Sequence, residues 1–142
     1  MKISIGADHA GFLIKQDIKS YLSKKDIDVE DVGTNSDDSV DYPDFAKKVA
    51  VSVANSDSDF GVLVCGSGIG MAISANRYPG VRAVVLRTSD DVRFSREHNN
   101  ANVACFGARF DSIEDIISNL EIFLETPFEG GRHQRRVDKI ER

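Results

Sequence analysis

Cysteine is scarce in this sequence, since only Cys65 and Cys105 occur in 142 residues. Two thiols in a chain of this length do not provide the disulfide framework of a small secreted domain. We therefore expect both cysteines to be free and the protein to be cytoplasmic. The first residues lead directly into a short strand-like run, and we expect no signal peptide.

Long apolar stretches and an excess of positive charge are also missing. No apolar run approaches the ~20 residues needed to cross a bilayer, which argues against a membrane protein. The formal net charge of −5 argues against a nucleic-acid-binding protein. There is no internal repeat and no low-complexity segment, so we expect residues 1–142 to form one globular domain.

Strand-like apolar runs alternate with amphipathic helical stripes along the chain. Strands are predicted at residues 2–6, 27–32, 60–64, 81–86 and 103–106. Helices are predicted around residues 14–22, from Pro43 onward, at 71–75, at 89–98 with Ser89 as the capping hydroxyl, and at 113–124. This alternation predicts a three-layer α/β/α fold with a five-stranded parallel sheet, flavodoxin/Rossmann-like in the strand order 2-1-3-4-5.

The most informative stretch is FGVLVCGSGIGMAISA, residues 60–75, which reads as a buried strand, a glycine-rich turn and the start of a helix. Such a turn lets backbone N–H groups and the positive end of a helix dipole approach an anion. Cys65 stands at the mouth of this turn, where its thiolate form is favoured. In the predicted strand order the loop with Asp8 and His9 lies beside it, at the edge where ligands bind.

The C-terminal tail, residues 127–142, is unusually basic for an acidic protein. Arg132, His133, Arg135 and Arg136 fall within five positions. If the tail is helical, Arg132 and Arg136 share one face, and their planar guanidinium groups suit phosphate oxygens. A segment this short buries little by itself, so we expect it to extend from the α/β core, residues 1–126, and dock on a partner subunit.

Each of these features also has a purely structural interpretation. The glycines can serve a tight turn, Cys65 can be a core residue, and Asp8 with His9 can cap the first helix. His98 can be a solvated residue at a helix end, and Tyr42 a hydrophobic residue at a helix entry. A phosphate-binding module without catalysis explains the glycines and arginines but not why Cys65, Asp8 and His98 occur together.

Two further chemical interpretations meet objections in the sequence. A low-molecular-weight cysteine phosphatase needs an arginine six positions after the cysteine, and Met71 occupies that position. A metal site made of His9, Cys65, His98 and His133 is conceivable, but no two of them have the usual spacing of zinc ligands.

Six segments together resemble one known family over essentially the whole chain. They are GADHAG at residues 6–11, DYPDFA at 41–46, CGSGIGM at 65–71, RAVV at 82–85, REHNNANVACFGAR at 96–109 and EGGRHQRRV at 129–137. The chain resembles the type B ribose-5-phosphate isomerases, a sugar-phosphate isomerase family that also contains galactose-6-phosphate isomerase subunits. The galactose-6-phosphate relatives usually lack His98 and the Arg-His tail, which this chain keeps, and Ser67 stands where many relatives have threonine.

The resemblance implies interconversion of ribose 5-phosphate and ribulose 5-phosphate through a cis-enediolate, with no metal or cofactor. It implies that Cys65 is the base and that His98 opens the furanose ring. It also assigns residues to the sugar, to the oxygens that become negative and to the phosphate. The sugar would be held by Asp8, His9 and Tyr42; the oxygens by Gly66, Ser67, Gly68, Ile69, Gly70 and Asn99; and the phosphate by Arg109, Arg132, His133 and Arg136.

The family is a homodimer or a dimer of dimers. The resemblance implies that each active site combines the Cys65 loop of one subunit with the His98 and tail regions of another. Isomerases of six-carbon sugar phosphates, such as allose 6-phosphate or galactose 6-phosphate, remain the alternative within the same family.

Overall fold

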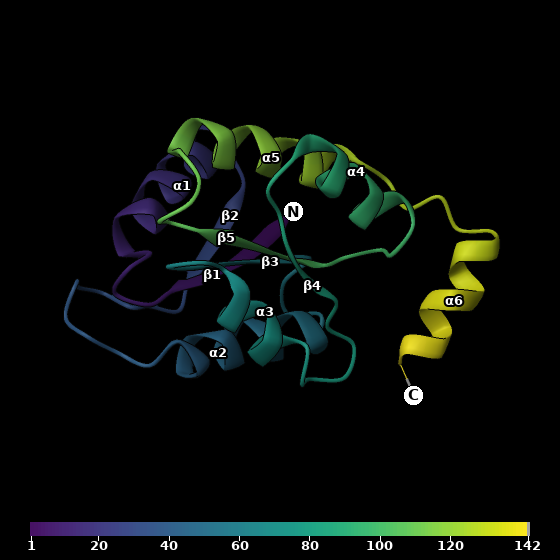
Figure 1. The fold of residues 1–142 in the computed structure, drawn as a ribbon, viewed down its shortest axis with the longest axis horizontal. Coiled ribbons are helices and arrows are strands. Elements are labelled where there is room, and N and C mark those ends of the chain that lie inside the picture. Colours follow the sequence, from purple (N-terminus) through teal and green to yellow (C-terminus); the bar gives the residue numbers. More distant parts are fainter. Residues whose placement is uncertain (142) are drawn as a thin grey trace.

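One sheet of five parallel strands forms the centre of the computed structural model, which describes residues 1–141 (Figure 1). The strands are β1 (Lys2–Ala7), β2 (Asp28–Asp31), β3 (Phe60–Cys65), β4 (Ala83–Val85) and β5 (Val103–Gly107). The helices are α1 (Phe12–Lys24), α2 (Tyr42–Ala54), α3 (Ile69–Ala75), α4 (Ser89–Glu97), α5 (Ile113–Glu125) and α6 (Arg132–Ile140). The predicted α/β/α class is confirmed.

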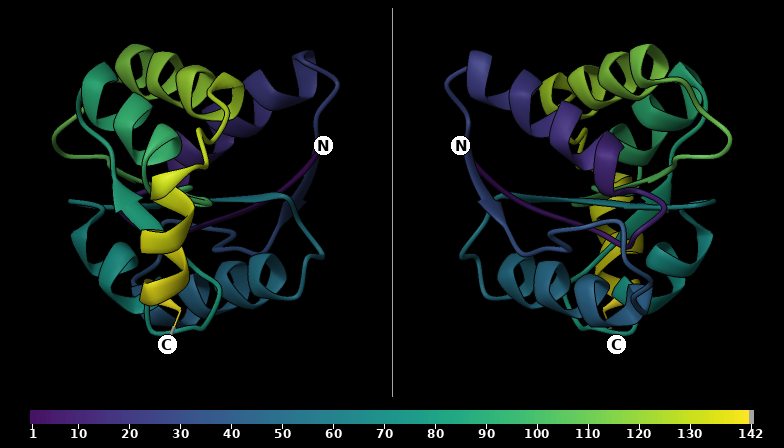
Figure 2. Two further views of the ribbon diagram at one scale, coloured as in Figure 1. Left: turned by 90° about the vertical axis from the view of Figure 1, so that its right-hand side faces the viewer. Right: turned by 90° about the vertical axis from the view of Figure 1, so that its left-hand side faces the viewer.

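Helices cover both faces of the sheet, with α1, α4 and α5 on one side and α2 and α3 on the other (Figures 1 and 2). Side chains of β3 contribute to the apolar cores on both faces of the sheet, because successive side chains of a strand point to opposite faces. Val62 and Val64 belong to the apolar cluster that includes α1 and α5 residues, whereas Leu63 and Cys65 belong to the cluster with α2 and α3. Cys65 therefore points toward the α2–α3 layer at the last position of its strand.

The predicted strand order is wrong at one edge, because the sheet runs β2-β1-β3-β5-β4 and not 2-1-3-4-5. Burial gives the physical reason. All five residues of β5 are buried, which suits an inner strand, whereas β4 has only three residues and both valines are partly exposed. The crossover through α4 therefore runs back toward the centre, and α4 lies on the same face as α1, as right-handed crossovers require.

Local signals place the helix starts to within one or two residues. Ser112 caps α5, since its hydroxyl accepts a hydrogen bond from the Asp115 N–H at 3.1 Å. The cap of α4 differs from the prediction, because Thr88 and not Ser89 accepts the equivalent bond from Asp91. Ser89 is instead the first helical residue.

The basic tail folds into α6, which crosses the end of the sheet from the α4–α5 layer toward the α2–α3 layer (Figure 2). Its contacts in this structure are with its own chain. The backbone N–H of Glu129 bonds to the Glu97 carbonyl at 3.1 Å, and the Glu141 carboxylate pairs with Arg82 and with the Gly80 N–H. The expected contact with a partner subunit remains a prediction. Within residues 1–141, no helix combines the length and apolarity needed to cross a membrane.

Candidate active site

A cavity of about 660 Å³ lies beside the carboxyl ends of β1, β3 and β5. Its lining comes from four separate segments of the chain. The lining residues are Asp8, His9, Ala10, Tyr42, Cys65, Gly66, Ser67, Ile69, Gly70, Ile73, Arg109 and Phe110. Nine of these twelve are residues singled out from the sequence, so the fold brings distant motifs to one place.

The Cys65 thiol lies at the wall of this cavity. Its side chain is only 5% exposed, yet it lines the cavity, and the Gly68 N–H donates a hydrogen bond to Sγ at 3.1 Å. A hydrogen bond from a backbone N–H stabilises a sulfur anion. The second cysteine, Cys105, is fully buried, and burial, reinforced by the nearby Cys65, raises the pKa of its thiol far above the ordinary value. The two thiols therefore have different chemistry.

At two positions of the turn the local geometry requires glycine. Gly68 has a φ of +79°, a left-handed conformation that L side chains rarely adopt. A Cβ on Gly70 would lie 2.6 Å from the Tyr42 ring, so only glycine lets that ring close the side of the cavity. The turn is thus shaped both by backbone conformation and by the approach of another segment.

Asp8 and His9 line the cavity and also form hydrogen bonds that hold the surrounding loops. The Asp8 carboxylate accepts hydrogen bonds from the N–H groups of Ala10 and Gly11 at 3.0 and 3.2 Å, and the side chain is nearly buried. His9 Nδ1 accepts a bond from the Val40 N–H at 3.2 Å, which leaves Nε2 as the nitrogen that carries the proton in the neutral ring. Both side chains are therefore held in fixed orientations at the cavity wall.

Sequence reasoning missed two apolar residues of the wall, Ile73 of α3 and Phe110 after β5. Both line the cavity, although 64% and 66% of their surface is exposed. Arg87 supports this wall: it donates to the Ser67 carbonyl at 2.8 Å, pairs with Asp111 at 2.7 Å and lies over the Phe110 ring. The correct strand order would have found this wall, because Gly107 of β5 pairs directly with Cys65.

A second group of candidate residues gathers around α6, away from this cavity. The His98 ring stacks on the His133 ring with a centroid distance of 4.3 Å, and Arg132 and Arg136 lie on the same helix as His133. Asn99 follows His98 and is exposed. None of these five residues lines the Cys65 cavity.

The two groups lie at opposite ends of the sheet. Cys65 ends β3, whereas His98 precedes β5 and contacts α6, which is anchored to Arg82 before β4. Because the strands are parallel, their starts and ends are separated by the length of a strand, about 16 Å for five residues. Within one chain, His98 and the tail arginines therefore do not meet Cys65.

The four residues considered for a metal site do not gather either. His98 and His133 lie together with Glu129, their ligand atoms within 4.8 Å of one another, while His9 and Cys65 line the other cavity. The two stacked rings differ by only 12° in plane. Their lone pairs therefore lie in nearly parallel planes, one ring above the other, and this arrangement does not converge on one ion.

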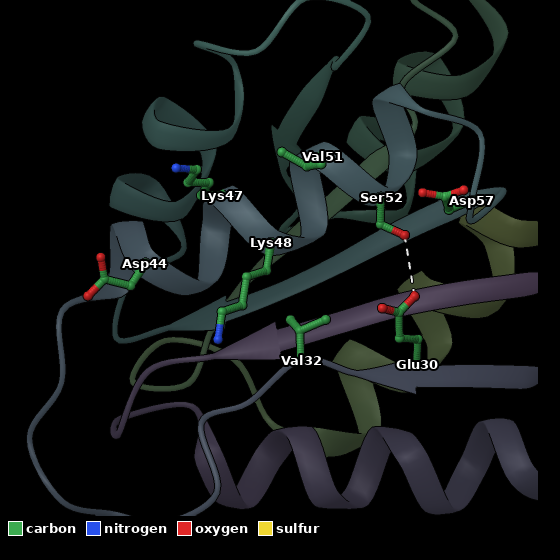
Figure 3. Close-up of a pocket in the computed structure, with 8 residues that line it drawn as sticks. All are labelled: Glu30, Val32, Asp44, Lys47, Lys48, Val51, Ser52 and Asp57. Carbon is green, nitrogen blue, oxygen red and sulfur yellow. Dashed lines mark hydrogen bonds between the residues drawn. The ribbon is translucent and has the colours of Figure 1, made fainter.

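A larger cavity, of about 770 Å³, lies between α2 and the edge strand β2 (Figure 3). Its polar residues carry charges of both signs, among them Glu30, Lys48 and Asp57, and the Ser52 hydroxyl donates to Glu30 at 3.4 Å. It contains no thiol or imidazole. The Cys65 cavity is therefore the candidate active site.

Comparison with known proteins places the chain in a recognised protein family. The sequence pattern of the Ribose/Galactose Isomerase family matches residues 3–140. The chain is 42% identical over 139 residues to ribose-5-phosphate isomerase B of Escherichia coli (strain K12), covering 98% of this chain and 93% of that protein.

Solved structures agree with this similarity. A crystal structure of a ribose 5-phosphate isomerase from Thermotoga maritima matches with a TM-score of 0.97 and 50% identity, covering 99% of this chain and 97% of the other. The structure of ribose-5-phosphate isomerase B from Mycoplasma genitalium with bound ribulose-5-phosphate matches with a TM-score of 0.94 and 44% identity, covering 98% and 93%.

Proposed function

The chain belongs to the Ribose/Galactose Isomerase family, and we propose that it interconverts D-ribose 5-phosphate and D-ribulose 5-phosphate. The observation that carries the proposal is the position of Cys65, a thiol hydrogen-bonded by the Gly68 N–H and facing a cavity with fixed polar groups. The near-complete similarity to ribose-5-phosphate isomerases B supports the substrate. A cytoplasmic location, favoured by two free cysteines, is part of this proposal.

The proposed chemistry uses Cys65 as the base. The thiolate takes the proton from C2 of the open-chain aldose, and the electron pair moves to give an enediolate with negative charge on O1. The same sulfur then delivers a proton to C1, partly after exchange of that proton with water, and the hydroxyl proton passes from O2 to O1, so the atoms balance. Ser67 and the backbone N–H groups of the turn stabilise the developing charge, where removing one donor typically costs about 3–4 kcal/mol.

His98 of a second subunit completes this proposal. Most ribose 5-phosphate is a closed furanose, so a general acid must protonate the ring oxygen before C2 can react. One chain keeps His98 and Cys65 at opposite ends of its sheet, and a neighbouring copy can bring them together. The exposed apolar side chains Ile69, Ile73 and Phe110 at the cavity support a contact there with a second copy.

Phosphate binding is assigned to Arg109 at the cavity and to the tail arginines Arg132 and Arg136 of the partner. Guanidinium groups bind phosphate oxygens bidentately, and a dianion gives binding energy remote from the reacting carbons. Asp8, His9 and Tyr42 would hold the sugar hydroxyls, and Asn99 of the partner an oxygen of the enediolate. The assembly is a homodimer or a dimer of dimers in this proposal.

A coupled assay for ribulose 5-phosphate formation tests the function. The purified chain, with EDTA present, is expected to convert ribose 5-phosphate without added metal. Allose 6-phosphate and galactose 6-phosphate, assayed in parallel, distinguish a six-carbon specificity. Turnover of neither a five-carbon nor a six-carbon phosphate would contradict the proposal and leave a binding module.

A further inference from the structure

His98 stacks on two aromatic rings. The Phe94 ring lies 5.1 Å from it, centroid to centroid, at an interplanar angle of 26°. The His133 ring lies closer and more nearly parallel, at 4.3 Å and 12°. Stacked contacts with two rings fix the plane of the imidazole and leave its edge, which carries the nitrogens, free for proton transfer.

The backbone that carries His133 is itself anchored at both ends of α6. Before the helix, the Glu129 N–H bonds to the carbonyl of Glu97, next to His98. After the helix, Glu141 accepts from the Gly80 N–H at 2.9 Å. His133 is 8% exposed, whereas Arg132 and Arg136 are exposed on the same helix. The His133 ring packs against His98 and not outward with the arginines, and His133 therefore differs from them in its surroundings.

Charge around His133 favours a neutral ring. Burial lowers its pKa, and the neighbouring His98 of α4 and Arg132 and Arg136 of α6 lower it further, against the opposing effect of Glu129, whose carboxylate lies 3.5 Å from Nε2. A second positive charge stacked on His98 would disfavour the imidazolium form that a general acid needs. A neutral His133 avoids this repulsion.

We propose that His133 is a positioning residue for His98: its neutral imidazole stacks on that of His98, fixes the ring plane and leaves His98 to carry the proton. This inference rests on the proposed function, in which His98 protonates the furanose oxygen. It replaces the sequence-based interpretation of His133 as a phosphate ligand.

Two substitutions separate positioning from phosphate binding. His133→Phe keeps a flat ring for the stack and removes both nitrogens, whereas His133→Ala removes the ring. Positioning predicts that His133→Phe keeps kcat close to wild type, while His133→Ala loses about tenfold or more in kcat for ribose 5-phosphate. Phosphate binding predicts instead an equal rise in KM for both variants.

A second measurement isolates the ring-opening step. Ribulose 5-phosphate does not form a furanose because its O5 carries the phosphate, so solvent deuterium exchange at its C1 reports enediolate formation without ring opening. His133→Ala is expected to keep the wild-type exchange rate. His133→Leu, which keeps apolar bulk without a flat ring, is expected to behave like the alanine variant and serves if that variant is poorly folded.

The outcomes distinguish this inference from the proposed function. Absence of ribulose 5-phosphate formation by the wild-type chain in the coupled assay would overturn the proposed function. If wild type is active, two results would overturn the positioning role alone. One is an equal loss of kcat in His133→Phe and His133→Ala. The other is no loss of kcat in His133→Ala and His133→Leu. A charge-bearing His133→Lys variant is expected to shift the pH profile of kcat/KM to lower pH, and an unchanged profile would contradict the electrostatic part.

Discussion

At the scale of single residues, two cysteines of one sheet have opposite properties. Cys65 lines a cavity and accepts a backbone hydrogen bond, whereas Cys105 is fully enclosed and burial raises the pKa of its thiol. Iodoacetamide at neutral pH is therefore expected to alkylate Cys65 first and to leave Cys105 unmodified while the chain is folded. Mass spectrometry of wild type and Cys65→Ser reports this, and label on Cys105 in the folded variant would contradict it.

The tail arginines allow a matched comparison on one helix. Arg136 is assigned to phosphate and Arg135, its exposed neighbour, points to a different side of α6 because adjacent helical residues do not share a face. Arg136→Ala is expected to raise KM for ribose 5-phosphate about tenfold or more, as for a lost charge-assisted hydrogen bond, while Arg135→Ala stays near wild type. Equal KM values in the two variants would place the phosphate elsewhere.

Many of the individual residues of the site could be predicted from short sequence motifs. Cys65 before a glycine turn and Asp8 after a first strand are visible in the sequence because each follows a strand end directly. The support that Arg87 gives to Phe110 and to the Ser67 carbonyl could not be predicted, since it joins segments about twenty residues apart. Likewise, the stack of His98 on His133 depends on where α6 lies.

At the scale of elements, one buried ion pair joins α1 to the edge strand β2. The Lys15 ammonium is fully buried and bonds to both oxygens of Asp31 at 2.7 and 2.8 Å, and Lys19 adds a third bond. Burial alone would raise the pKa of Asp31, but the bonds from Lys15, Lys19 and the Gly33 N–H outweigh it, so the pKa lies below the ordinary value of 3.8.

Replacing Asp31 with asparagine is expected to destabilise the fold. The change leaves the Lys15 charge buried without its partner, which typically costs about 3–5 kcal/mol of unfolding free energy. The exposed Asp28 of the same strand provides the control, and Asp28→Asn is expected to change stability by less than about 0.5 kcal/mol. Urea denaturation measures both, and similar losses in the two variants would contradict this explanation.

The pH dependence of this stabilisation follows from the direction of the pKa shift. Because the folded-state pKa of Asp31 is lower than in the unfolded chain, its contribution is complete above the unfolded value and is lost as the pH falls through the folded value. The stability difference between wild type and Asp31→Asn should therefore shrink in acid.

The order of β4 and β5 in the sheet could not be determined from the sequence. The runs at β4 and β5 are both apolar and similar in length, and periodicity does not say which lies inside. The structure decides it through complete burial of β5 and the short, half-exposed β4. This order also explains why Arg109 and Phe110, which follow β5, lie beside Cys65.

At the scale of the whole molecule, the chain separates the two halves of its proposed chemistry. The predicted order of elements already implied this separation, because Cys65 follows its strand whereas His98 precedes the next one in a parallel sheet. An isolated chain would hold a base without a ring-opening acid. The proposed assembly of two copies joins them at a cavity with exposed Ile69, Ile73 and Phe110.

Complementation tests the shared site. Cys65→Ala and His98→Asn chains are each expected to be inactive on ribose 5-phosphate alone. When the two are unfolded and refolded together, about a quarter of the wild-type activity is expected, because half of the dimers are mixed and each has one intact site of two. A mixture no more active than its parents would show that each site uses a single chain.

Deuterium exchange at C1 of ribulose 5-phosphate, measured by NMR for wild type and Cys65→Ala, tests the role of the sulfur most directly. Wild type should exchange this hydrogen with solvent, and Cys65→Ala should not, although it still binds the sugar phosphate in a calorimetric titration. Exchange by Cys65→Ala at the wild-type rate would contradict the assignment of Cys65 as the base.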